Sequence, residues 1–313
     1  MIVRKRPRGW QLFFIVRGSI LYSIRWSLLV NTLLAIAVTY VHGNLFKVKI
    51  TLTTIPFTLI GLALAIFLGF RNSATYDRYW EGRKLWGELV IQTRVLCRQI
   101  LAYANPTDFR HSGTHQDPEQ DTQVRRLIAF SHALRHHLRD TDPQPDITPH
   151  LSDEDLSRCL KAQHRPESLL HQMARQFDQW QQDGRLREIT AMELDKGLSA
   201  LQRVVGACER IKHTPLPFSY TLMLHRTAYL YCLLLPFGLV DTIGFMTPVV
   251  VAIVSYTFFG LDALGDEIEE PFGMSPNDLP LSAICRSVER LLREQLGDDD
   301  LPPPLEPDNH CLS

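Results

Sequence analysis

Long uncharged runs alternate with strongly polar segments along the chain. The most informative run, residues 50–70, reads ITLTTIPFTLIGLALAIFLGF and contains no charged side chain. At about 1.5 Å per residue, a helix of this length crosses the roughly 30 Å hydrocarbon core of a bilayer. Three further apolar runs lie at about residues 21–41, 222–240 and 242–261. The pattern predicts four membrane-spanning helices, although the third run, taken alone, is also compatible with a buried helix of a soluble protein.

Short connections join the first two runs and the last two, so we expect two helical hairpins. Basic residues cluster before the first run and after the second, namely Arg4, Lys5, Arg6, Arg8, Arg17, Arg71, Arg78, Arg83 and Lys84. The first hairpin loop has only Lys47 and Lys49, and the second has neither Lys nor Arg. The positive-inside rule therefore places both termini and the middle region in the cytoplasm.

The middle of the chain has the apolar spacing of amphipathic helices, and no convincing run of strands is visible. Ser152 precedes three acidic residues and is a good helix N-cap. We therefore predict an all-α fold. Its expected parts are a basic cytoplasmic segment (1–20), transmembrane hairpin 1 (21–70), a helical cytoplasmic domain (71–214), transmembrane hairpin 2 (215–262), cytoplasmic helices (263–296) and a disordered tail (297–313).

Composition agrees with a membrane protein that carries a polar domain. The mean hydropathy is only -0.07 and the formal net charge is -1, so the averages conceal two different halves and give no argument for nucleic-acid binding. The six cysteines are scattered without a CxxC pair, which favours reduced thiols over a disulfide framework. The first apolar run is too long for a signal peptide and lacks a small-residue cleavage site. No phosphate-binding loop, nucleophile elbow or kinase signature is present, so the sequence does not indicate an enzyme.

Several polar clusters are candidate sites. His132 and His136 lie one helical turn apart beside His137, but no third ligand follows at a set spacing, so we favour a solvated basic face over a metal site and expect no cofactor. The acids after the fourth apolar run could attract cations or could form the ordinary polar face of a helix leaving the membrane, and we weigh these alternatives evenly. They are Asp262, Asp266, Glu267, Glu269 and Glu270.

Within the second apolar run, Leu62, Ile66 and Phe70 recur every four residues among the small residues Gly61, Ala63, Ala65 and Gly69. An apolar stripe of this kind usually packs against other helices, but it could also line a narrow pore. Small residues allow membrane helices to approach closely.

Three separated segments resemble the bacterial branch of the bestrophin channel family: FLGFRNSATYDRYWEGRKLWGEL (67–89), ERIKHTPLPFSYTLMLHRTAYLY (209–231) and FFGLDALGDEIEEPFG (258–273). The resemblance extends over about residues 8–292. It implies a homopentamer around a central pore, with neck rings at Leu62, Ile66 and Phe70 and a cytosolic constriction at Ile189 beside Glu188.

The same resemblance leaves calcium gating unsupported. Animal bestrophins carry a dense acidic run after the PFG motif, whereas here MSPNDLPL follows it, with Asp278 as the single acid. Bacterial members look more like cation-conducting pores.

We therefore expect a passive channel for monovalent ions, selective for cations such as Na⁺ and K⁺, with an apolar neck as its gate. The alternatives are an anion (chloride) channel, as in animal bestrophins, a membrane-anchored scaffold without ion flux, and a secondary transporter. The expected partners are further copies of the chain, the lipid bilayer and monovalent ions, and the expected location is the bacterial inner membrane.

Overall fold

The computed structural model describes residues 1–3, 9–10, 18–41, 44–45, 48–49, 54–104, 117–308 and 310–312. Helices dominate these residues, which confirms the predicted helical fold class. The named strands in the described part are β1 (Asn44–Leu45) and β2 (Val48–Lys49), a short antiparallel pair in the first hairpin loop. The chain divides into two compact units.

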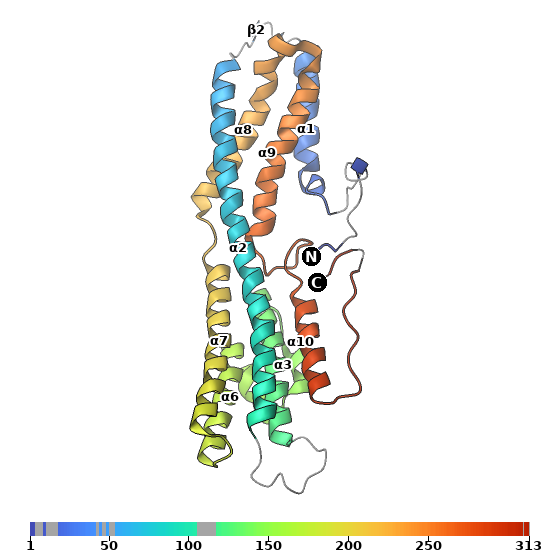
Figure 1. The fold of residues 1–313 in the computed structure, drawn as a ribbon. Coiled ribbons are helices and arrows are strands. Elements are labelled where there is room, and N and C mark those ends of the chain that lie inside the picture. Colours follow the sequence, from blue (N-terminus) through green and yellow to red (C-terminus); the bar gives the residue numbers. More distant parts are fainter. Residues whose placement is uncertain are drawn as a thin grey trace. The chain divides into compact units, whose positions relative to one another are not determined.

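The membrane unit comprises Arg4–Trp80 and Pro215–Glu270. Its helices run side by side in Figure 1 and are α1 (Leu21–Tyr40), the first part of α2 (Thr54–Tyr103), α8 (Phe218–Ile243) and α9 (Thr247–Glu269), with the 3₁₀ turn η3 (Gly244–Met246) between the last two. By length and composition, three helical stretches could cross a membrane, namely Leu21–Tyr40, Ile55–Tyr103 and Phe218–Glu269. The last stretch contains both α8 and α9.

Side chains from all four helices form the core of the membrane unit. Leu64 and Leu68 of α2 pack with Leu224 of α8, Phe258 of α9 and Ile24 of α1. Between α1 and α9, the Asn31 side-chain amide donates a 2.6 Å hydrogen bond to Ser255 Oγ, which satisfies two buried polar groups.

Helix α2 does not end where its apolar run ends at Phe70 but continues to Tyr103. After Phe70 the helix contains no proline, and most of its residues are compatible with a helix, so nothing local terminates it. One helix therefore supplies a long apolar segment to the membrane unit and a polar segment to the second unit.

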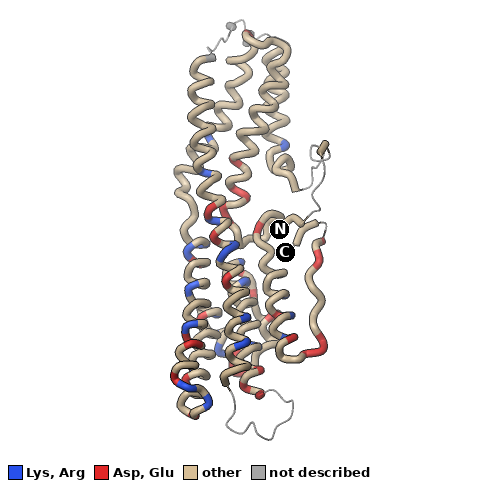
Figure 2. Tube along the Cα trace, in the orientation of Figure 1, with Lys and Arg blue, Asp and Glu red and all other residues tan. Residues whose placement is uncertain are grey.

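The polar unit comprises Met1–Val3, Glu81–Thr214 and Pro271–Ser313. Besides the end of α2, it contains α3 (Pro118–Arg139), α4 (Gln144–Ile147), η2 (Thr148–His150), α5 (Asp153–Lys161), α6 (Arg165–Gln182), α7 (Glu188–His213) and α10 (Leu281–Gln295). Figure 2 shows acidic and basic residues distributed throughout this unit, whereas the helices of the membrane unit carry few. The predicted cap is confirmed, because Ser152 Oγ accepts a 3.2 Å hydrogen bond from the Asp155 amide.

Helix α3 is the most deeply buried helix of the polar unit, and α6 and α10 pack against it. A buried ion pair joins Arg126 of α3 to Asp155 of α5 at 2.7 Å. The segment after α10, which we expected to be disordered, makes defined contacts: Arg290 Nη1 donates to the Pro302 carbonyl at 2.9 Å. The two ends of the chain also meet, since the Met1 amino group donates to the Leu312 carbonyl.

Candidate ion pathway

The predicted neck residues share one face of α2. Leu62, Ile66 and Phe70 are 61%, 48% and 65% exposed, whereas Leu64 and Leu68 between them are buried in the core. Residues four positions apart lie on the same side of a helix, so the three exposed side chains form one continuous stripe. This stripe points away from the core of its own unit and is available to lipid or to other subunits.

Directly after the stripe, Arg71 turns into the opposite face of α2 and is completely buried. Its Nη1 lies 2.7 Å from Asp262 Oδ1, and its Nη2 donates to Asp266 Oδ1. The neighbouring Asn72 donates a 3.0 Å hydrogen bond to the Leu261 carbonyl. These contacts hold the C-terminal end of the α2 apolar run against α9 and fix the rotation of α2 about its axis.

The candidate acids therefore have unequal environments. Asp262 is buried, paired with Arg71 and bonded at 2.6 Å to His225 Nδ1, so it does not face solvent as a cation-attracting residue would. Glu269 accepts a 3.0 Å hydrogen bond from the Leu216 amide. Asp266 pairs with Arg71 but keeps a half-exposed side chain. Glu267 is partly buried, and Glu270 is exposed at the end of α9.

Glu188 and Ile189, the residues expected at the cytosolic constriction, are the first two residues of helix α7. Glu188 is the first residue of this helix and is exposed, a position at which a carboxylate stabilises the helix N-terminus. Ile189 follows it and is 76% exposed, although it is a large apolar side chain. The polar unit of a single subunit therefore leaves Ile189 uncovered.

Sequence analysis did not single out Asp77. It lies seven residues after Phe70 on the same helix, so it continues the exposed stripe two turns further, and its side chain is exposed. Its spacing could have identified it, because a residue seven positions after Phe70 returns to the same face of the helix. We ended the stripe at Phe70 because the apolar run ends there. Likewise, Arg71 served in the sequence analysis only as one of the basic residues that indicate how the chain is oriented in the membrane.

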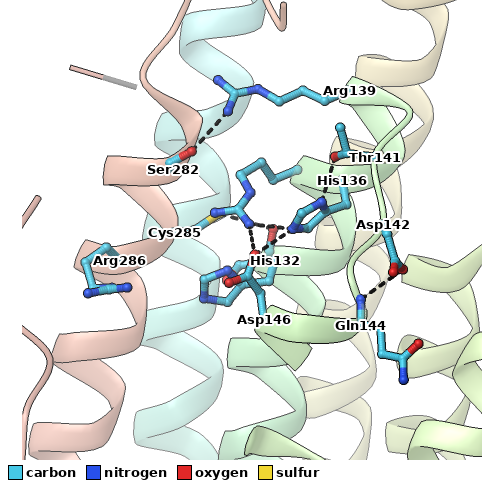
Figure 3. A network of polar contacts seen from close by, with 12 residues as sticks. His132, His136, Arg139, Thr141, Asp142, Gln144, Asp146, Ser282, Cys285 and Arg286 are labelled. Carbon is cyan, nitrogen blue, oxygen red and sulfur yellow. Dashed lines mark hydrogen bonds and ion pairs between the residues drawn. The ribbon is translucent and has the colours of Figure 1, made fainter. Parts of the chain in front are cut away.

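The histidines do not form the solvated basic face that we expected. His132 is 3% exposed because α10 packs over this part of α3. The His136 ring bonds Asp146 Oδ2 at 2.7 Å and Thr141 Oγ1 at 2.6 Å (Figure 3), and burial lowers its pKa. His137 bonds Glu209 at 2.7 Å. The rings of His136 and His137 bond partners outside α3, which the spacing within α3 does not reveal.

The family model described as "Bacterial/Fungal Bestrophin protein" matches residues 1–294. The chain belongs to the bestrophin family. This confirms the resemblance inferred from the three sequence segments, and it indicates an ion channel of the membrane rather than an enzyme.

Individual relatives of this bestrophin are similar over nearly their full lengths. "Voltage-dependent anion channel-forming protein YneE" of Escherichia coli K12 is 40% identical over 312 residues, which cover 99% of both chains. "Voltage-dependent anion channel-forming protein RSc3414" of Ralstonia nicotianae is 39% identical and covers 96% of both. Among solved structures, a bacterial bestrophin homologue from Klebsiella pneumoniae is 40% identical, with a TM-score of 0.81 over 88% of this chain and 100% of that chain.

Proposed function

We propose that this bestrophin assembles as a homopentamer and conducts monovalent ions passively through a pore lined by α2. The observation that carries the proposal is the exposed stripe of Leu62, Ile66 and Phe70, opposite the buried face of the same helix. Three large apolar side chains aligned toward a symmetry axis would form three stacked rings. A closed ring of subunits would also cover apolar surface that one subunit leaves open.

The rings would act as a gate. An apolar constriction can lose its water, and an ion that enters it gives up hydration without receiving polar ligands in return. The resulting barrier falls when the neck widens, so conduction depends on the side-chain size and packing at these three positions. Ile189, exposed at the start of α7, is the proposed second constriction.

We propose cation selectivity on the basis of charge. Residues 50–70 include no basic side chain, and Asp77 extends the stripe with an exposed carboxylate. Glu188 adds a carboxylate beside the second proposed constriction. Acidic groups along the wider parts of a pore raise the local concentration of cations and disfavour anions. In this proposal the apolar neck sets conductance, while the carboxylates set selectivity.

An anion channel is the second candidate, and the names of two relatives favour it. Both E. coli YneE and the Ralstonia protein are called voltage-dependent anion channel-forming proteins. At about 40% identity, the sign of the permeant ion can still differ, because it depends on few charged side chains.

The deciding experiment is planar-bilayer recording of the purified protein under a NaCl gradient. A reversal potential near the sodium equilibrium potential supports the cation pore, and one near the chloride potential supports the anion channel. Native mass spectrometry of the same sample tests for five subunits. Folded pentamers that carry no current, even with Ile66→Ala to widen the neck, would instead support a membrane-anchored scaffold.

We further propose an inner-membrane location with both termini in the cytoplasm. The distribution of basic residues around the apolar runs supports this orientation. The contact between Met1 and Leu312 is compatible with it, since the two ends belong to one unit.

A further inference from the structure

We propose that His132, His150 and Glu289 form a binding site for one divalent transition-metal ion, of which Zn²⁺ is the representative probe. The three side chains come from α3, η2 and α10 of the polar unit. One ligand atom from each residue can be chosen so that all three lie within 4.8 Å of one another. Figure 3 shows His132 on α3, with Arg286 on the neighbouring α10. The inference is independent of the proposed pore.

The distances within this cluster suit a shared metal better than direct hydrogen bonds. His132 Nε2 lies 3.6 Å from Glu289 Oε2, and His150 Nε2 lies 3.6 Å from Glu289 Oε1. A separation of this size is too long for a hydrogen bond. A tetrahedral zinc ion with bonds of about 2.0–2.1 Å holds its ligand atoms roughly 3.3 Å apart, so a small inward movement would complete the site.

Burial makes these rings unusual. His132 is 3% exposed, His150 is 8% exposed and Glu289 is 7% exposed. Both nitrogens of His132 and the Nδ1 of His150 are buried without a hydrogen-bond partner among the described residues. Buried polar atoms are nearly always satisfied, so unpartnered imidazole nitrogens beside a buried carboxylate indicate a missing ligand.

The chemistry of the donors selects the metal class. Two imidazoles and one carboxylate suit Zn²⁺, Co²⁺ or Ni²⁺, whereas Mg²⁺ and Ca²⁺ prefer oxygen ligands throughout. A histidine must be neutral at the nitrogen that binds metal.

Two arginines of α10 also approach Glu289 without using all of its acceptor capacity. Arg286 Nε lies 3.2 Å from Oε2, and Arg293 Nη1 lies 3.7 Å from Oε1. Arg293 is closer to Asp298, at 2.7 Å, and so is shared with that carboxylate. An ionised carboxylate has about four acceptor positions. The arginines therefore orient Glu289 and leave room for a metal ion.

A second histidine cluster, His137, His164 and Glu209, lacks these properties and provides a matched control. Its His137 Nε2 already forms a 2.7 Å hydrogen bond with Glu209 Oε1. The side chain of His164 is 56% exposed. Because its partners are satisfied or solvated, this cluster needs no metal.

The test uses the full-length protein purified in detergent without a histidine tag, stripped with EDTA and then titrated with ZnCl₂. We expect one zinc per subunit by elemental analysis after desalting. His150→Ala and Glu289→Gln should each weaken zinc affinity by at least about tenfold, while His164→Ala leaves it unchanged. Failure of the wild-type protein to retain zinc would overturn the proposal, as would a loss of binding in His164→Ala but not in His150→Ala.

A second measurement does not depend on the folding of the variants. Co²⁺ added to the metal-free wild-type protein should give the strong visible absorption of a four-coordinate ion, and Zn²⁺ should displace it. Only the weak spectrum of hydrated Co²⁺ would overturn the proposal and leave Glu289 with the two arginines as its charged partners.

Discussion

Arg71 of α2 and Asp262 of α9 form an ion pair that the membrane unit encloses almost completely. The Nη1–Oδ1 distance is 2.7 Å, and the two side chains are 0% and 3% exposed. Phe70, the residue before Arg71, is 65% exposed. Successive side chains of a helix point about 100° apart, so the pair that holds Arg71 inward also determines the direction of Phe70.

Breaking this pair on one side should destabilise the protein strongly. Arg71→Met leaves the buried Asp262 carboxylate without its guanidinium, and should cost about 3–5 kcal/mol of unfolding free energy because an uncompensated charge remains buried. Asp262→Asn should cost less, because Arg71 keeps its ion pair with Asp266. The Arg71→Met/Asp262→Leu double variant should lose less than the sum of the single variants. Denaturant unfolding in detergent measures all of them, and additive losses would contradict direct coupling.

Gly61 permits close packing between α2 and α8. A Cβ atom at this position would lie 2.6 Å from Tyr231 Oη. The Tyr231 ring is itself held near Phe57 and in edge contact with Phe258, with centroids 6.0 Å and 5.3 Å away. Gly61→Ala should therefore cost about 1–3 kcal/mol by overpacking, measured by unfolding in detergent.

The matched control for Gly61 lies on the same helix. A Cβ at Gly87 would meet nothing within 4 Å, so Gly87→Ala should be neutral or stabilise the helix by up to about 1 kcal/mol. Adding Tyr231→Phe to Gly61→Ala should restore part of the loss, since it removes the atom nearest the new methyl group. Equal effects at the two glycines would argue against the close approach.

The helices were predictable from sequence because their signals are local. Apolar run length identified α1 and the start of α2, and Ser152 marked the start of α5. The extension of α2 to Tyr103 was missed, because a change from apolar to polar composition is not a helix stop signal.

Contacts between distant elements were not predictable in the same way. The role of Arg71 depends on α9, which lies about 190 residues later in the chain. The burial of His132 depends on α10, and its candidate co-ligands His150 and Glu289 come from two other elements. The exposure of Ile189 has no explanation within one chain. Its proposed role came only from the family resemblance, which carries information about assembly.

Cys311 provides a test of orientation. It is partly exposed, whereas the other five cysteines, which include Cys97 and Cys285, are buried. Burial raises the pKa of the Cys285 thiol to about 12, which further suppresses its reactivity. A membrane-impermeant maleimide should label the protein in inverted inner-membrane vesicles but not in intact spheroplasts, and Cys311→Ser should abolish that labelling. Labelling of intact spheroplasts would place the C-terminus outside.

The neck proposal predicts that smaller side chains increase current. Ile66→Ala and Phe70→Ala should each raise single-channel conductance in planar bilayers, because widening an apolar ring lowers the cost of ion dehydration. The reversal potential under a salt gradient should change little. Phe67→Ala is the control, since Phe67 is also large and 45% exposed but lies about 100° from Ile66 around the helix. Unchanged currents in both neck variants, or an equal rise in Phe67→Ala, would argue against a neck at these positions.

Selectivity should respond to different residues from those that set conductance. Asp77→Asn and Glu188→Gln remove exposed carboxylates while preserving side-chain size. If these groups concentrate cations, each variant should move the reversal potential under a NaCl gradient from the sodium value toward zero, and the double variant should move it further. The shift should shrink at high ionic strength, where screening shortens the range of exposed charges to a few ångströms.

Asp155→Asn is unsuitable as a control for these two variants because Asp155 is buried with Arg126, and its loss would perturb the fold. Glu154→Gln is better matched, since Glu154 is exposed and its ion pair among the described residues is with Arg158, one turn along α5. It should leave the reversal potential unchanged. A wild-type channel whose reversal potential already follows chloride, with no response to Asp77→Asn or Glu188→Gln, would assign selectivity to basic groups and support the anion-channel alternative.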